Sequence, residues 1–273
     1  MASTLSGLAT LSGVGAATLY ALGAALQIAK LSRQRTLGHG MLVALTLPAL
    51  VLHAAVTYQQ VNTAEGIYLG LFTAASLITL VMVLFVLLAS VRLPVHNLLV
   101  LVLPAAAAAV AGSLLVDTGF QSRRSLSPAL GVHILFSVFA YSVLFMAACQ
   151  SLLLAYQEHT LKRRNSIALL RLLPPLETME ALLFTLLWTG VLALTAAIAT
   201  GFVFLEDMFA QHVVHHTVLA MASWLLYTVL LAGRHFLGWR SSTATYWTLI
   251  AFSLLVLGYF GSKFVMEILL ERA

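Results

Sequence analysis

The histidines are the residues of this chain whose type points most directly to chemistry. Nine histidines occur in a sequence of 273 residues that is 61% hydrophobic, a large number for so apolar a chain. A neutral imidazole nitrogen is a common ligand of haem iron and of other metal ions. Which histidines could act together depends on the helices that carry them and on the depth at which each one lies.

A long apolar segment, residues 212–240, carries polar side chains at helical spacing. Those that matter here are His216, Ser223, Tyr227 and Arg234. Their separations of 7, 4 and 7 residues place them on one face of a helix. A polar face inside so apolar a helix is costly against lipid. We therefore expect this face to contact other helices or a buried ligand, and we count His216 and Tyr227 as candidate cofactor-binding residues.

The composition matches a lipid bilayer as the surrounding solvent. Only 8% of the residues are charged and mean hydropathy is +1.00, whereas a soluble globular domain carries about 25% charged residues. Apolar segments of about 20 residues, the length of a membrane-spanning helix, recur along the chain. We predict an all-α polytopic integral membrane protein with about eight helices in a single transmembrane domain, residues 1–273. The expected spans are about 5–29, 39–58, 67–91, 96–116, 131–156, 177–205, 216–238 and 243–269.

The distribution of lysine and arginine predicts that both chain termini lie on the outer side of the membrane. In that orientation 10 of the 14 basic residues fall in cytoplasmic connections and 4 fall on the outer side, in line with the positive-inside rule. The outer four are Arg123, Arg124, Lys263 and Arg272. Basic residues spread over short connections do not form a nucleic-acid-binding surface, so we expect no nucleic-acid partner.

Three separate helices bring a histidine to about the same outer depth. His53 lies near the outer end of the second span, His133 at the outer start of the fifth, and His216 at the outer start of the seventh, just after His212 and His215. A bis-histidine haem needs two neutral nitrogens from separate helices, on opposite faces of the ring. We interpret these histidines as candidate ligands of one haem.

Residues near His133 favour the same interpretation. The helix face that begins at His133 is mostly small, which would let a helix or a flat ring approach closely, and Tyr141 flanks that face. Arg123 and Arg124 precede this helix on the outer side. They are either a solvated loop pair or partners for an anionic group such as a haem propionate.

An alternative to the haem site is that each histidine only makes hydrogen bonds within the protein or at the membrane surface. A single histidine near the end of a span is more often a hydrogen-bonding residue than a ligand. The histidines at the cytoplasmic level carry only this interpretation, and they are His39, His96, His159 and His235.

Covalent haem attachment is excluded by the cysteine content. The one cysteine, Cys149, lies inside an apolar span, and no C-x-x-C-H motif occurs. Any haem must be bound non-covalently. The common hydrolase, metalloprotease and nucleotide-binding motifs are also missing from the sequence, and we expect no bond-making step.

Three stretches of the chain resemble the cytochrome c assembly protein family, in its short branch of HemX-like and YpjD-like inner-membrane proteins. They are HILFSVFAY at 133–141, LLPPLETMEALLF at 172–184 and HHTVLAMASWLLYTVLLAGRHFLGW at 215–239. The similarity runs from about residue 40 to 270. It implies a protein of the bacterial inner membrane that handles haem b, and it implies that His133 is an outer-face haem ligand.

The chain departs from the haem-export members of that family at two places. Those members carry a tryptophan-rich loop where this chain has FLEDMFAQHVVHHT, and a second outer histidine where it has GSKF. The resemblance therefore implies haem binding for a purpose other than export. His216 is then the second ligand, because it lies where the family's haem loop joins the helix, and His53 is the alternative.

Two functions from different classes follow. The first is a haem b-binding accessory protein with bis-histidine ligation, whose partners are the bilayer, haem and proteins of cytochrome c maturation or haem synthesis. The second is a haem-free transporter or transporter-associated subunit, in which the histidines pack or relay protons. A b-type electron carrier is a third, weaker interpretation. An optical spectrum of the purified protein separates the first two.

Overall fold

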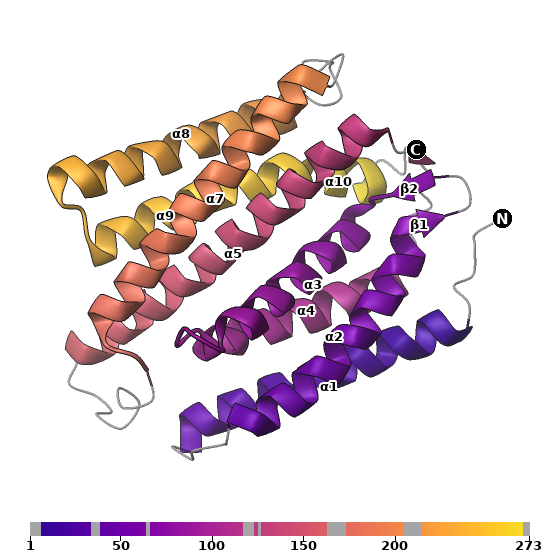
Figure 1. Ribbon diagram of the computed structural model, residues 1–273, viewed down its shortest axis with the longest axis horizontal. Helices are drawn as coiled ribbons and strands as arrows, with labels where there is room; N and C mark the ends of the chain where they lie inside the picture. The colour runs from indigo at the N-terminus through magenta and orange to yellow at the C-terminus, as the bar shows by residue number, and fades with distance from the viewer. Residues whose placement is uncertain are drawn as a thin grey trace. The chain divides into compact units, whose positions relative to one another are not determined.

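The structure is a computed structural model that describes residues 7–33, 39–63, 66–116, 123–124, 127–162, 173–204 and 214–269 (Figure 1). Its contacts divide the chain into two compact units. The first unit is Met1–Leu126 with Val265–Ala273, and the second is Ser127–Phe264. The single transmembrane domain, residues 1–273, stays a prediction.

The all-α, polytopic membrane fold is confirmed. Within the described residues, 8 helices are long and apolar enough to cross a membrane. They are Gly7–Ala29, Gly40–Val61, Leu71–Ala89, His96–Leu115, Pro128–Lys162, Leu176–Phe204, Val214–Leu237 and Ser241–Leu269. The predicted spans match them in number and order. The fifth helix differs most, because it continues to Lys162, past the predicted end at residue 156. Its last turn is stabilised by an ion pair between Glu158 and Lys162, four residues apart, at 3.1 Å.

The first unit is built around four long helices. They are α1 (Gly7–Arg33), α2 (His39–Val61), α3 (Leu71–Ala89) and α4 (Leu99–Leu115), and the short η1 (His96–Leu98) leads into α4. Helix α1 packs against α2 and α4, and α3 packs against α4 and α2. Close approach of α3 and α4 depends on Gly112, because a Cβ there would lie 2.4 Å from the Phe72 ring.

A small antiparallel sheet, which the sequence did not indicate, links two connections of the first unit. Its strands are β1 (Asn62–Thr63), β2 (Gly66–Tyr68) and β3 (Arg123–Arg124), in the order β1-β2-β3. Arg124 pairs with Ile67 and Arg123 with Tyr68. Strands of two or three residues carry no alternating pattern long enough to be recognised in a sequence.

The chain returns to the first unit at its C-terminal end. The π-helical segment η3 (Val265–Leu269) carries Glu267, which is only 2% exposed. Its carboxylate accepts a hydrogen bond of 2.9 Å from the backbone N–H of Leu71, at the start of α3. A carboxylate is favoured there, because the first N–H groups of a helix have no partner within the helix.

The second unit contains the other long helices. They are α5 (Pro128–Lys162), α7 (Leu176–Phe204), α8 (Val214–Leu237) and α9 (Ser241–Val256), followed by the π-helical turn η2 (Leu257–Gly261) and the short α10 (Ser262–Phe264). Helix α5 packs along α7 and against α9, and α8 packs along α9 and against α7 and η2 (Figure 1). Gly190 lets α5 approach α7, since a Cβ there would lie 2.5 Å from Leu144.

The polar face predicted on α8 does contact another helix. The Ser223 hydroxyl donates to the carbonyl of Ala251 at 2.8 Å, and the Tyr227 hydroxyl reaches the carbonyl of Thr248 at 3.5 Å. Both side chains are fully buried, at 0% exposure. The face therefore joins α8 to α9, as expected for a polar stripe that avoids lipid.

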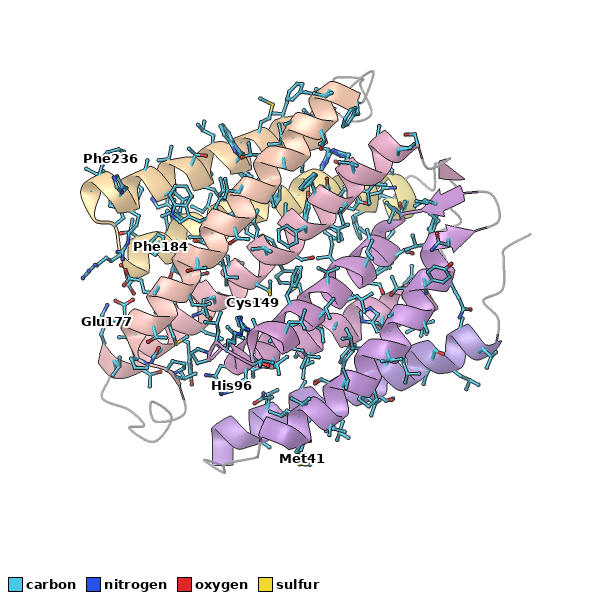
Figure 2. All side chains as sticks on the ribbon, viewed as in Figure 1. Met41, His96, Cys149, Glu177, Phe184 and Phe236 are labelled. Carbon is cyan, nitrogen blue, oxygen red and sulfur yellow. The ribbon has the colours of Figure 1, made fainter. Side chains whose placement is uncertain are left out.

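The stretches LLPPLETMEALLF and GRHFLGW meet at one end of the second unit. Arg234 on α8 pairs with Glu180 on α7 at 2.6 Å, and its guanidinium lies 4.5 Å from the centroid of the Phe184 ring. Figure 2 shows Phe184 on α7. Gly233 and Gly238 shape the turn between α8 and α9. A Cβ on Gly233 would lie 2.4 Å from Trp239, and Gly238 has a φ of +67°, which glycine adopts without strain.

Candidate functional site

His133 lies in the first turns of α5 and is oriented by the backbone of α7. Its Nδ1 is 3.0 Å from the carbonyl oxygen of Ala197 and 3.4 Å from the hydroxyl of Thr200. A carbonyl oxygen only accepts, so Nδ1 carries the proton and donates. The neutral ring then keeps its lone pair on Nε2, where a Ser137 hydroxyl lies at a long 3.4 Å. A ring held at Nδ1–H with a weakly engaged Nε2 has the arrangement of a metal-ligating histidine.

His216 lies in the first turn of α8, against the π-helical turn η2. Its ring meets that of Tyr259 edge to face, with centroids 5.7 Å apart and an interplanar angle of 69°. Its Nδ1 is buried and makes no hydrogen bond with any residue that the structure describes. The Gly258 backbone lies beside the ring, without the alignment of a hydrogen bond to Nδ1.

The structure brings His133 and His216 together within the second unit. The two imidazoles are close enough to interact electrostatically. They are carried by different helices that both begin at this end of the unit. Two of the predicted histidines are therefore neighbours in space, although they are 83 residues apart in the sequence.

A group of aromatic rings lies beside His216. The Tyr259 centroid is 6.0 Å from that of Tyr141 and 5.2 Å from that of Phe260, and Tyr141 lies 6.3 Å from Phe260. The Tyr141 hydroxyl donates to the carbonyl of Leu255 at 3.0 Å, which holds its ring in place. Tyr141, predicted from its position on α5, is thus part of this site. Flat apolar rings of this kind suit the edge or face of a porphyrin.

The sequence did not single out Tyr259, Phe260 and Gly258. They lie in the run LGYFG, the π-helical turn η2. π-Helical turns are rare and often occur at functional sites. Two glycines around an aromatic pair late in an apolar span are the only signal in the sequence that could have indicated this turn.

His53 lies in the first unit, and both of its ring nitrogens are engaged. Nδ1 is 3.3 Å from the Tyr20 hydroxyl, and Nε2 is 2.9 Å from the Ser76 hydroxyl. Ser76 is in turn 2.9 Å from the Thr57 hydroxyl. His53 is 0% exposed. A fully buried histidine with two partners is satisfied without a metal, and its role as the alternative ligand stays a prediction.

Tyr227 is the remaining predicted residue of the second unit. Tyr227 is 11 residues, about three turns, along α8 from His216, and its hydroxyl faces α9. Arg123 and Arg124 lie in β3, in the first unit. Their pairing with haem propionates stays a prediction. His212 and the stretch that replaces the tryptophan-rich loop fall largely outside the described residues.

The comparison with known families bears on what this site binds. The model described as Cytochrome C assembly protein matches residues 41–270. The chain belongs to the cytochrome c assembly protein family. The match has nearly the limits that the resemblance indicated, about 40 to 270. Membership in this family indicates a haem-related function.

Two relatives extend this finding. The inner membrane protein YpjD of Escherichia coli K12 is 28% identical over 223 residues, which cover 81% of this chain and 84% of that protein. An uncharacterized 28.8 kDa protein from the nifR3-like 5' region of Azospirillum brasilense is 37% identical over 143 residues, 52% of this chain and 53% of the relative. No solved structure matches. With its eight described spans, this family member is a multi-pass protein of the inner membrane.

The residues of the site fit a haem better than a bare metal ion. Among the described residues, no three His, Cys, Asp or Glu side chains gather in a way that could hold a metal. A haem iron needs at most two ligands from the protein, because the porphyrin supplies four nitrogens. His133 and His216 are two imidazoles on separate helices. Nδ1 of His216 is buried and has no hydrogen bond within the described chain. The His216 ring could therefore turn when a ligand binds, without losing a hydrogen bond at Nδ1.

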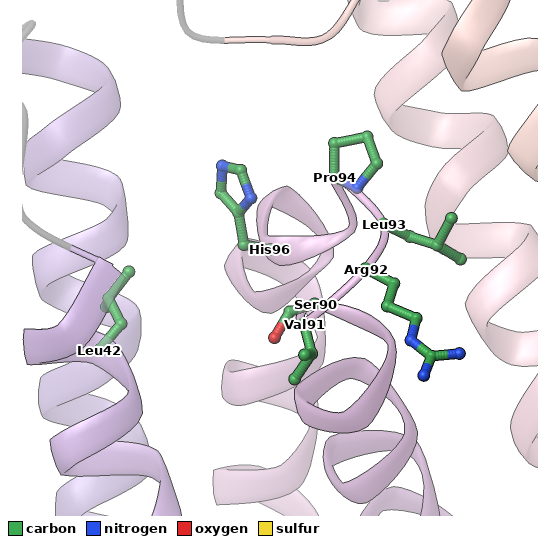
Figure 3. A pocket seen from close by; sticks show the side chains of 7 residues that line it. All are labelled: Leu42, Ser90, Val91, Arg92, Leu93, Pro94 and His96. Atoms are coloured by element: carbon green, nitrogen blue, oxygen red, sulfur yellow. The ribbon is translucent and has the colours of Figure 1, made fainter.

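A cavity of about 400 Å³ lies in the first unit and contains none of the predicted ligands. It is lined by Leu42, Ser90, Val91, Arg92, Leu93, Pro94 and His96, around the turn between α3 and η1 (Figure 3). Arg92 and His96 point in different directions there (Figure 3). Their side chains do not converge on one point, so this cavity does not compete with the histidine site.

Proposed function

We propose that this protein is a haem b-binding accessory protein of the inner membrane, acting in cytochrome c assembly, haem handling or the regulation of haem synthesis. His133 and His216 would hold the haem iron, near the outer face. The observation that carries the proposal is the state of His133. Its Nδ1–H is fixed on the Ala197 carbonyl, and its Nε2 has only a 3.4 Å contact.

Residues of α5, α7, α8 and η2 would position the haem. The α7 backbone sets the rotation of His133, and the aromatic rings of Tyr141 and Tyr259 limit the space beside His216. A haem held by two imidazoles supplies one-electron redox chemistry and absorbs strongly in the visible range. The protein itself performs no bond-making step in this proposal. It holds haem without a covalent bond, because Cys149 is a buried, free cysteine.

Haem titration of the purified protein tests this assignment. His133→Ala and His216→Ala are each expected to weaken haem binding by at least about tenfold, since loss of groups at a metal site costs about 10- to 100-fold in affinity. His159→Ala is the matched control. His159 is an exposed residue on the same helix as His133, in its last turn. Equal affinity in all three variants would refute the assignment of the ligands.

One observation favours a second function, a haem-free transporter or transporter-associated subunit. Tyr20, His53, Ser76 and Thr57 form a buried chain of hydrogen bonds in the first unit. Buried ionisable groups in spanning helices often mark proton or substrate paths. Protein that stays colourless when haem is supplied would support this function over the first.

A further inference from the structure

The two proposed ligands, His133 and His216, differ in the hydrogen bonding of their Nδ1 atoms. Nδ1 of His133 has a backbone acceptor, the Ala197 carbonyl at 3.0 Å. Nδ1 of His216 is cut off from solvent but has no hydrogen bond within the described chain. Histidines that ligate metals almost always donate their second N–H to a carbonyl or carboxylate, which fixes the ring and raises its basicity. His216 therefore needs an acceptor once iron is bound.

The π-helical turn η2 places such an acceptor beside the ring. Helix α8 packs against η2 at His216. The Gly258 carbonyl lies next to the imidazole. Little space is left at position 258: a Cβ there would lie 3.2 Å from Cβ of Leu219, which is tight, and in ordinary contact with the His216 carbonyl oxygen at 3.4 Å and Nδ1 of His216 at 3.6 Å.

The Gly258 carbonyl also accepts from a side chain. The Ser262 hydroxyl, one turn later, donates to it at 2.8 Å. A carbonyl oxygen has two lone pairs, so the hydrogen bond from Ser262 does not by itself prevent it from accepting an imidazole N–H. The hydroxyl draws electron density from the oxygen, which makes the carbonyl a weaker acceptor for its second partner.

We propose that the Gly258 carbonyl is the acceptor that orients His216 and that Ser262 sets its strength. The inference rests on the proposed haem-binding function. On haem binding the His216 ring turns slightly, Nδ1–H engages the Gly258 carbonyl, and Nε2 is directed to the iron. Gly258 and Ser262 are positioning residues, because both act through His216 and neither touches the iron.

A pair of glycine variants tests the orienting role. Gly258→Ala is expected to weaken haem binding at least about tenfold, because the new Cβ enters the space between η2 and the His216 ring. Gly261→Ala is the matched control in the same turn. Its Cβ would meet only the Leu257 side chain, at 3.7 and 3.9 Å, so haem affinity is expected to stay within about twofold of the parent.

Ser262→Ala tests the tuning without adding any atom to the site. The haem should still bind, and its midpoint potential should become more negative. Without the hydroxyl, the carbonyl is a stronger acceptor for Nδ1–H, the imidazole becomes a stronger donor, and ferric iron is stabilised. Thermal unfolding of the haem-free variants shows whether each one is folded.

The outcomes separate this inference from the function on which it rests. If the parent protein binds haem, but Gly258→Ala and Gly261→Ala bind it equally and Ser262→Ala keeps the parent's potential, the orienting role is wrong and the haem function stands. A parent protein that takes up no haem would overturn both. A tenfold loss confined to Gly258→Ala, with a negative shift in Ser262→Ala, supports the inference.

Discussion

At the scale of single residues, the surroundings of each imidazole decide its role. His53 and His133 each have at least two polar neighbours, but these neighbours are arranged differently around the two rings. Both nitrogens of His53 are engaged by side chains from other helices, and the residue is 0% exposed. His133 is fixed at Nδ1 by a backbone carbonyl, while Nε2 has only a long contact. Only the second arrangement leaves a lone pair that iron could use at little cost.

This difference makes a prediction for His53→Ala. The variant removes the partners of Tyr20 and Ser76 in a buried site, so the free energy of unfolding should fall by about 1–3 kcal/mol. Haem affinity and the haem spectrum should not change. Thermal unfolding in detergent and haem titration measure the two effects. Loss of the haem spectrum in a variant that remains folded would show that His53 is a ligand after all.

At the scale of helices, one ion pair ties α7 to the corner between α8 and α9. Glu180 and Arg234 are 16% and 30% exposed, and they lie 2.6 Å apart. Arg234 also donates to the carbonyl of Trp239 at 3.0 Å. Arg240 lies 3.9 Å from the same carboxylate but is 76% exposed, so it contributes little. The pair joins two motifs that are 54 residues apart in the sequence.

Arg234→Met is therefore expected to destabilise the protein by about 2 kcal/mol, because it leaves a largely buried carboxylate without its partner. Glu180→Gln combined with Arg234→Met should recover part of that loss, since no unpaired charge remains. Unfolding of the two single variants and the double variant in detergent measures the coupling. Strictly additive losses would show that the pair is not coupled.

Helix positions were predictable from the sequence, but the contacts between helices were not. Long apolar segments and their order follow from hydropathy, which is why eight spans appear where expected. The face of α8 that carries Ser223 and Tyr227 was also predictable, because helical spacing groups polar residues on one side. Nothing local indicates that Tyr20 would meet His53, or that η2 would widen into a π-helical turn beside His216.

The candidate site was predictable to the same limited degree. His133 and His216 could be chosen because they begin separate spans and share an expected depth. Tyr141 could be placed beside them by its position on the His133 helix. Gly258 and Tyr259 could not, since their role depends on how tightly the last helix packs against α8. Tyr227 shares the helical phase of His216 but lies about three turns along α8 from it, and its hydroxyl faces α9, so its part in binding a cofactor stays a prediction.

For the whole molecule, a haem site near the outer face requires a particular orientation in the membrane. The distribution of basic residues predicts that the ends of α5 and α8 that carry His133 and His216 lie on the outer side. Alkaline phosphatase, which is active only outside the cytoplasm, should then be active when fused after Phe204 and inactive when fused after Lys162. A fluorescent protein that folds only in the cytoplasm should give the opposite pattern. The reverse result at both positions would place the histidines on the cytoplasmic side.

The central claim is that two imidazoles in the second unit hold one haem. The most direct measurement is the absorbance spectrum of the purified protein after haem is supplied, in the oxidised and the reduced state. Ligation by two histidines should give a sharp Soret band and, on reduction, separate α and β bands typical of low-spin iron with two nitrogen ligands. A protein that remains colourless, or one whose spectrum is high-spin with a single axial ligand, would contradict it.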